Sequence, residues 1–249
     1  MGIIVDIGNS AYHFAEFADD SPSCEYAEPK NVLGAPCEGV DFADVDRWLR
    51  SKSKPIRWKL GSVNPNRLLQ LTNWIDSRNE PYHVVTYRDL PIKNSLQHPE
   101  KVGIDRLAAA AAANRLRAPD RPAIVVDAGT AITVDCVSAA GVFLGGTIAP
   151  GLKMSMQALN KEAAQLPLSK IRSTPKMIGD STEPAIQAGV YWLTVGGVDR
   201  LLSDLQQELA GPCSMFATGG SMTALLPNLK NEPKLFPHLV LSGLALANS

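Results

Sequence analysis

Several features that mark common protein classes are absent from this sequence of 249 residues. No apolar run reaches the ~20 residues that a membrane helix needs, and the first residues, 1–6, lack the basic segment of a signal peptide. The cysteines form no C-x-x-C pair, so we expect reduced thiols rather than a disulfide framework or a zinc site. They are Cys24, Cys37, Cys136 and Cys213. These absences predict a cytoplasmic protein without a membrane partner.

A charge surplus and the best-known motifs of nucleotide and catalytic sites are also missing. Lysine and arginine total 24 and aspartate and glutamate 25, whereas a nucleic-acid-binding surface usually needs a basic surplus. There is no G-x-x-x-x-G-K-[ST] loop, G-x-G-x-x-G fingerprint, G-x-S-x-G elbow or H-E-x-x-H pair. The four histidines lack metal-like spacing and are expected to be surface or packing residues. We therefore expect no nucleic-acid partner, whereas a small anion remains compatible with the composition.

One segment near the start of the chain is echoed in its middle. Residues 3–10 and 124–131 are both β-branched runs that end in Asp-x-Gly and a small polar residue, and each is followed by a second extended stretch. Such an echo favours a duplicated architecture, although strands ending in Asp-Gly turns are common and coincidence is the alternative. The proline-rich break at 118–122 lies between the copies and predicts two domains, 1–118 and 119–249.

Helices and strands are predicted to alternate along the chain. The strongest helix contains six consecutive alanines, and alanine is the best helix former. Helices are expected at residues 40–51, 65–78, 104–117, 153–164, 182–209, 221–226 and 239–247, and strands at 56–63, 82–87 and 215–218. Residues 127–148 are hairpin-like, and 145–151 are predicted to form a shaped loop, with a hairpin end as the alternative. This mixture favours an α/β or α+β fold.

The two Asp-Gly turns are candidates for binding phosphate. Their glycines, Gly8 and Gly129, allow a tight turn and close backbone approach. Nearby N–H groups and hydroxyls can then donate hydrogen bonds to phosphate oxygens. Asp6 and Asp127 would repel a bare phosphate. Each carboxylate therefore fits a phosphate site only if it binds a cation that in turn contacts the phosphate. The alternative is a pair of ordinary turns with capping aspartates.

Two further motifs could complete a site. In residues 217–221, paired glycines would let a flat ring or a ribose lie against the backbone, although a plain strand-to-helix turn capped by Ser221 is the alternative. Asp105 and Arg106 begin the alanine-rich helix. Arginine could hold a substrate carboxylate while the aspartate accepts a hydroxyl proton. The simpler interpretation is that Asp105 stabilises the positive end of the helix.

Taken in order, these motifs resemble those of the type III pantothenate kinases, within the acetate and sugar kinase/Hsp70/actin superfamily. The family shows D-x-G-N-[TS] first, G-x-D-R before a helix, and D-x-G-T-A-x-T-x-D midway. G-G-x-I-x-P-G and T-G-G follow. The matching residues here are 6–10, 103–106, 127–135, 145–151 and 218–220. The resemblance therefore spans nearly the whole chain.

The resemblance implies an α/β fold of two ribonuclease-H-like domains with mixed sheets flanked by helices. A nucleotide would bind in the cleft between the domains. It implies transfer of the γ-phosphoryl group of ATP to the primary hydroxyl of pantothenate, the first step of coenzyme A synthesis. The implied cofactors are Mg²⁺ and a monovalent cation, K⁺ or NH₄⁺. The implied assembly is a homodimer with pantothenate bound near the subunit interface.

The resemblance also implies roles for individual residues. Asp105 corresponds to the general base, and Asp127 and Asp6 to the metal-binding carboxylates. The nucleotide-binding residues are expected to be Asp6, Ile7, Gly8, Asn9, Ser10, Thr130, Gly219 and Gly220. The substrate-binding residues are expected to be Leu96, Gly103, Ile104, Asp105, Arg106 and, across the dimer, Thr182.

The sequence departs from the family pattern at a few positions. Leu96 stands where the family usually has a tyrosine that contacts pantothenate, and Ser10 stands where threonine is commoner. Residues 11–13 replace a usually more polar stretch. Two alternative functions follow. One is a non-catalytic accessory factor of the same family, and the other is a related small-molecule kinase with a different hydroxyl acceptor.

Overall fold

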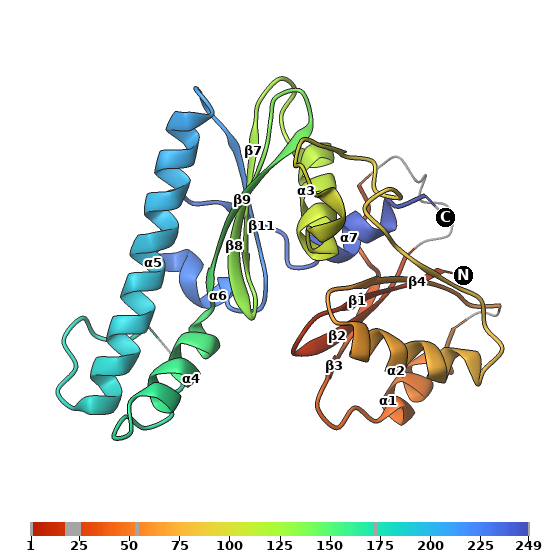
Figure 1. Ribbon diagram of the computed structural model, residues 1–249, viewed down its shortest axis with the longest axis horizontal. Helices are drawn as coiled ribbons and strands as arrows, with labels where there is room; N and C mark the ends of the chain where they lie inside the picture. The colour runs from red at the N-terminus through yellow and green to blue at the C-terminus, as the bar shows by residue number, and fades with distance from the viewer. Residues whose placement is uncertain (1, 18–25, 53–54, 172–173, 249) are drawn as a thin grey trace. The chain divides into compact units, whose positions relative to one another are not determined.

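The computed structural model describes residues 2–17, 26–52, 55–171 and 174–248 of an α/β protein (Figure 1). Cys24 lies outside the described residues. By its internal contacts the chain divides into two compact units. Unit 1 comprises Met1–Leu116, Gly141–Phe143 and His238–Ser249, and unit 2 comprises Arg117–Ala140 and Leu144–Pro237. In the described part of the chain, no helix is both long and apolar enough to cross a membrane.

Unit 1 contains a mixed five-stranded sheet with helices on both faces. Its strand order is β3 (Asn31–Pro36), β2 (Ala11–Glu16), β1 (Gly2–Ile7), β4 (Arg57–Ser62) and β5 (Tyr82–Val84). Strand β2 is antiparallel to β1 and β3, whereas β4 is parallel to β1 and β5. Helices α1 (Phe42–Leu49) and α2 (Pro65–Asp76) cover one face, and α3 (Ile104–Leu116) and α7 (Leu239–Ala245) cover the other (Figure 1). The β-branched residues of β1 are buried between these layers.

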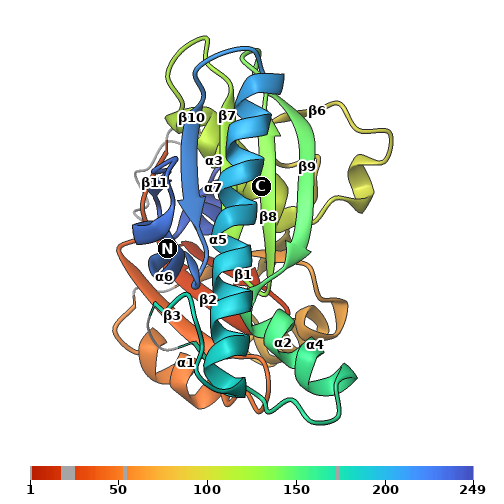
Figure 2. The same ribbon diagram turned by 90° about the vertical axis from the view of Figure 1, so that its left-hand side faces the viewer.

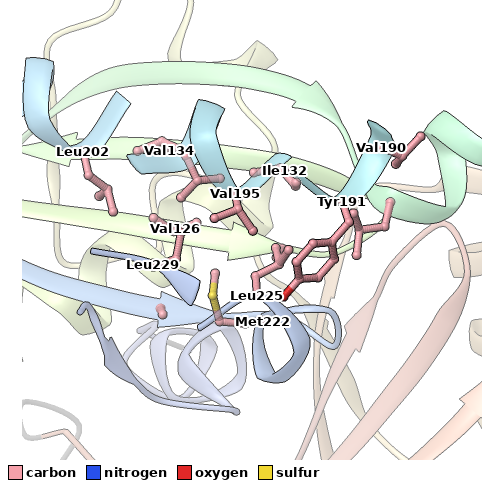
Figure 3. Packing of buried hydrophobic residues seen from close by; sticks show 14 of the residues in the cluster. Val126, Ile132, Val134, Val190, Tyr191, Val195, Leu202, Met222, Leu225 and Leu229 are labelled. Carbon is pink, nitrogen blue, oxygen red and sulfur yellow. The ribbon is translucent and has the colours of Figure 1, made fainter. Parts of the chain in front are cut away.

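Unit 2 is built around a second sheet. Its order is β11 (Lys234–Leu235), β10 (Ser214–Thr218), β7 (Ala123–Ala128), β8 (Ala131–Val137) and β9 (Val142–Pro150), with β6 (Lys93–Asn94) beside β9. The helices of unit 2 are α4 (Leu152–Glu162), α5 (Thr182–Glu208) and the single turn α6 (Met222–Leu225), followed by a short 3₁₀ segment at Leu226–Asn228. A second 3₁₀ segment, Pro99–Lys101, belongs to unit 1. Helix α5 runs along the sheet (Figure 2). Its residues Val195 and Leu202 pack with Val126 and Val134 of the strands in a buried core (Figure 3).

Apart from the additional edge strand β6, the two sheets have the same strand order. In each, the first strand of the unit pairs antiparallel with the second and parallel with the fourth, and the order is third, second, first, fourth, fifth. The repeated Asp-Gly segments form the first hairpin of both sheets. The echo in the sequence therefore reflects a repeated architecture. The predicted fold, two ribonuclease-H-like domains with mixed sheets flanked by helices, is confirmed.

The limits of several elements differ from those predicted. Residues 145–150 belong to strand β9, so the prediction of a shaped loop there was wrong. A Cβ on Gly146 would lie 2.0 Å from the carbonyl oxygen of Val134, so this glycine allows close strand approach rather than forming a loop. The strand at 82–87 ends at Val84, and the helix at 221–226 is a single α-turn without a side-chain cap at Ser221.

The division into units also differs from a single cut after residue 118. The short strand β6 pairs with Val142 and Phe143, which therefore group with unit 1. Helix α7 packs against α3, β1 and β4, so the end of the chain groups with unit 1 as well. The proline-rich segment 118–122 marks where the chain leaves unit 1. It does not indicate which sheet a later helix covers.

The packing of α7 on α3 depends on small residues. All six alanines, Ala108–Ala113, are buried, and a Cβ on Gly243 would lie 1.8 Å from the carbonyl oxygen of Ala108. We expect Gly243→Ala to lower the free energy of unfolding by about 3 kcal/mol, because backbone atoms of α3 must move. Gly197→Ala in α5 is the control, since its Cβ would meet nothing within 4 Å. Urea unfolding of both variants tests this, and equal midpoints would contradict it.

Candidate active site

In unit 1, the first Asp-Gly turn (residues 6–10) connects β1 with β2. The N–H of Gly8 donates to the carbonyl of Ala11 at 3.0 Å and closes the turn. Asn9 and Ser10 at its tip are exposed, whereas Ile7 is fully buried and anchors the strand end. Asp6 is only 18% exposed, and its carboxylate lies 3.6 Å from Nδ1 of His13 on the paired strand. The turn thus presents a short polar tip next to a half-buried carboxylate.

The start of helix α2 supports this turn. Because β1 and β4 are parallel, their carboxyl ends meet at one edge, where the N–H of Val63 donates to the carbonyl of Ile7 at 3.1 Å. Asn64 then caps α2 by accepting the N–H of Arg67 at 3.2 Å. Its Nδ2 also donates to Oδ1 of Asn9 at 3.2 Å. Sequence reasoning missed Asn64, although an Asn-Pro pair opening a helix is a recognisable capping signal.

The predicted substrate motif lies beside the same strand end. A Cβ on Gly103 would be 2.4 Å from Oδ1 of Asp105 and 3.6 Å from the side chain of Val63. Asp105 accepts the N–H of Arg106 at 2.7 Å, in the first turn of α3. The glycine therefore leaves room for the carboxylate, which is half-buried. Within unit 1 the fold brings the first turn and the Gly103–Arg106 motif to the same strand ends.

Leu96 follows a short segment that is fixed by hydrogen bonds. Oδ1 of Asn94 accepts the N–H of Leu96 at 2.9 Å, and Ser95 donates to the carbonyl of Phe143 through its N–H at 3.2 Å and its hydroxyl at 3.0 Å. The guanidinium of Arg106 lies 5.9 Å from the centroid of the Phe143 ring, within the range of cation–π attraction. Phe143 thus connects the segment that carries Leu96 with the predicted carboxylate-binding arginine.

In unit 2, the second Asp-Gly turn (residues 127–131) connects β7 with β8. It is tighter than the first, because the pair Ala128–Ile132 encloses residues 129–131 only, whereas Ile7–Tyr12 encloses residues 8–11. The N–H of Gly129 donates to the carbonyl of Ala131 at 3.0 Å. Thr130 is exposed at the tip and Asp127 is half-buried. The two turns therefore share a framework but differ by one residue at the tip.

Two glycine loops pack directly on the second turn. Gly219 has a φ of +93°, and a Cβ there would lie 2.4 Å from Oδ1 of Asp127 and 2.6 Å from the backbone of Ala128. The N–H of Gly151 donates to the carbonyl of Thr130 at 3.1 Å. A Cβ on Gly151 would lie 2.6 Å from that same carbonyl oxygen. The backbone of Gly219 thus packs against Asp127, and the backbone of Gly151 packs against Thr130. In contrast, a Cβ on Gly220 would meet nothing within 4 Å.

Thr182 belongs to neither the second turn nor these loops. It is the first residue of α5 and is exposed. A Cβ on Gly179 would lie 2.2 Å from the backbone nitrogen of Ala185, so the preceding segment packs closely on the first turn of the helix.

Among the described residues, no three His, Cys, Asp or Glu side chains gather as a metal-binding group. Each turn instead offers one half-buried aspartate, Asp6 or Asp127. Such a site suits a hard cation that keeps water and ligand oxygens in its coordination shell, and does not suit zinc, which takes three or four protein ligands.

Comparison with known sequences identifies one family. The profile of type III pantothenate kinases matches residues 2–204. A type III pantothenate kinase of Acidiphilium cryptum is 35% identical, with 99% of this chain and 93% of that protein covered. One of Moorella thermoacetica is 36% identical, with 99% and 98% covered. The match to one of Parafrankia sp. is 40% identical but covers 61% of this chain and 59% of that protein.

Comparison with solved structures supports the fold. The ethanolamine utilization protein EutJ from Carboxydothermus hydrogenoformans has a TM-score of 0.54 at 14% identity, covering 99% of this chain and 89% of that chain. A putative 2-dehydro-3-deoxygalactonokinase from Sinorhizobium meliloti has a TM-score of 0.51 at 12% identity, with 98% and 97% covered. At these identities the likeness concerns the fold alone.

Proposed function

The chain belongs to the type III pantothenate kinase family, and we propose that it transfers the γ-phosphoryl group of ATP to the primary hydroxyl of pantothenate. The product is 4′-phosphopantothenate, which opens coenzyme A synthesis. The single observation that carries this function is the family match over nearly the whole chain. Phosphoryl transfer is mostly positioning and charge neutralisation, and the two Asp-Gly turns with the Asp105–Arg106 pair supply groups for both.

Asp105 is the proposed general base. Its carboxylate is held at the start of α3 by the N–H of Arg106, at 2.7 Å, and the missing side chain of Gly103 leaves space beside it. It would accept the hydroxyl proton as pantothenate attacks. Arg106 would bind the pantothenate carboxylate through its fork of donors. Gly103, Ile104 and, through apolar contact, Leu96 would line the same site.

The nucleotide would be held by backbone groups rather than by a basic surface. We assign Ile7, Gly8, Asn9 and Ser10 of the first turn to the phosphates. Thr130 of the second turn would also contact ATP, and the adenosine would lie against the Gly219–Gly220 backbone. Exposure of Asn9, Ser10 and Thr130 at the turn tips supports these roles. The near-zero net charge of the chain is compatible with this mode of binding.

Asp6 and Asp127 are the proposed carboxylates for the cations. We assign Asp127 to a monovalent cation, K⁺ or NH₄⁺, and Asp6 to the Mg²⁺ that accompanies ATP. Their oxygen chemistry fits hard cations, and a Cβ on Gly219 would occupy the space beside Asp127 Oδ1, at 2.4 Å. When bound, these cations neutralise charge on the transferring phosphoryl group. The protein side chains hold the cations in place.

A homodimer and a cytoplasmic location are the remaining parts of the proposal. The homodimer is what the family implies. Unit 2 exposes large apolar side chains that a partner subunit would cover, namely Leu144, Ile148, Met154, Leu159, Leu168, Met177, Ile178 and Leu193. Thr182, which is also exposed, would then reach pantothenate bound to the partner subunit. The free thiols of Cys37, Cys136 and Cys213 fit a reducing compartment.

The proposal is tested by incubating the purified protein with Mg²⁺, K⁺, ATP and pantothenate. We expect mass spectrometry to detect 4′-phosphopantothenate, and replacement of K⁺ by Na⁺ to lower the rate severalfold. A panel of other hydroxy acids serves as the control for acceptor identity, since Leu96 replaces the usual tyrosine. Phosphorylation of another acceptor but not of pantothenate would overturn the proposed substrate. Equal rates in K⁺ and Na⁺ would remove the proposed role of Asp127.

A further inference from the structure

The carbonyl groups of the first turn are bound by a residue that no motif includes. Cys37 directly follows β3 and is 1% exposed. Its N–H donates to the carbonyl of Ser10 at 3.0 Å. Its thiol donates to the carbonyl of Gly8, with Sγ 3.6 Å from the oxygen. One buried cysteine therefore binds two carbonyls of the same turn, on either side of Asn9.

An anion-binding turn needs this kind of support. Backbone N–H groups attract a phosphate and backbone carbonyls repel it, so the carbonyls must be engaged elsewhere. Here the N–H of Gly8 already closes the turn by donating to Ala11, at 3.0 Å. Cys37 engages the carbonyls of Gly8 and Ser10 from the side of the buried core. The exposed tip at Asn9 is thereby held in one backbone conformation.

We propose that Cys37 is a positioning residue for nucleotide binding. It holds the first turn in the conformation in which the tip of that turn binds the phosphates of ATP. This inference rests on the proposed function, and specifically on the role of the first turn.

The thiol acts as a hydrogen-bond donor and not as a reactive group. Burial is the main cause that raises the pKa of the Cys37 thiol, and the negative charge of Asp6 raises it further, while Arg67 opposes the shift. The thiol therefore stays protonated at neutral pH and can donate its hydrogen bond to the carbonyl of Gly8. Cys136 offers a contrast. It is also buried, but it lies within the apolar core of unit 2, among residues of β7, β8 and α5.

Two variants of Cys37 with side chains of equal shape distinguish the effect of its hydrogen bond from the effect of its packing. Cys37→Thr keeps a donor, and Cys37→Val has the same branched shape without one. We expect the KM for ATP of Cys37→Val to be about fivefold above that of Cys37→Thr, the scale of one lost hydrogen bond. The KM for pantothenate should be alike in the two. Cys136→Val, which removes a buried thiol away from the first turn, should leave both KM values at the wild-type level.

Titration calorimetry with Mg²⁺-ATP gives a readout that does not need catalysis. The same fivefold difference between Cys37→Thr and Cys37→Val is expected in the Kd for ATP. If pantothenate is not phosphorylated but this difference in Kd is found, the proposed function fails and the positioning role stands. Equal Kd values in the two variants, with both folded by circular dichroism, would overturn the positioning role. Should the branched pair not fold, Cys37→Ser and Cys37→Ala provide the same comparison.

Discussion

Replacing Asp105 by asparagine is expected to lower kcat about a thousandfold while the Kd for ATP changes less than about twofold. A positioned general base contributes ~10²–10⁴ to the rate. Asparagine keeps the size of the side chain and can still accept the N–H of Arg106, which is 2.7 Å from Oδ1. It cannot take up the hydroxyl proton of pantothenate. Steady-state kinetics and titration calorimetry with Mg²⁺-ATP measure the two quantities separately.

A nearby carboxylate provides the control for loss of charge. Glu100 lies in the 3₁₀ segment just before the Gly103–Arg106 motif and is 51% exposed. Glu100→Gln removes the same unit of negative charge, and we expect kcat within about twofold of wild type because screened surface charges contribute little. A parallel loss of kcat and ATP affinity in Asp105→Asn would instead mean that Asp105 maintains the structure at the start of α3.

The strongest sequence patterns led to the correct architecture because they are local. The β-branched runs before Asp6 and Asp127 specify buried strands, and the following glycines specify turns whatever the rest of the chain does. The alanine run 108–113 likewise specifies a helix. Since these signals recur in two similar halves, the topology followed from combining local inferences with the family resemblance.

The remaining features depend on contacts between distant residues, which a single sequence does not encode in a readable form. Gly146 allows β9 to approach Val134 closely, since a Cβ on Gly146 would lie only 2.0 Å from the carbonyl oxygen of Val134. In the sequence alone, the same glycine-rich pattern is typical of a loop. The short strands β6 and β11 have two residues each and carry no periodicity. The roles of Asn64 and Cys37 depend on which side chain the fold brings to the first turn.

Gly219 carries the largest steric constraint at the second turn. Gly219→Ala is expected to raise the Kd for ATP at least about tenfold and to lower the free energy of unfolding by about 3 kcal/mol. Its φ of +93° is unfavourable for any residue with a Cβ. That Cβ would also lie 2.4 Å from Oδ1 of Asp127 and 2.6 Å from the backbone of Ala128, so the second turn must move. Calorimetry and urea unfolding measure the two effects.

The glycine before the same strand gives the matched control. Gly211 precedes β10, whereas Gly219 follows it, and a Cβ on Gly211 would meet nothing within 4 Å. Gly211→Ala should therefore leave the Kd for ATP unchanged and the stability within about 0.5 kcal/mol. If Gly219→Ala lost stability but bound ATP as tightly as Gly211→Ala, the loop would be a structural support only. The added Cβ displaces the second turn, so an unchanged Kd would mean that this turn does not contribute to ATP binding. The proposed contact of ATP with Gly219 and the proposed cation site at Asp127 would then both be wrong.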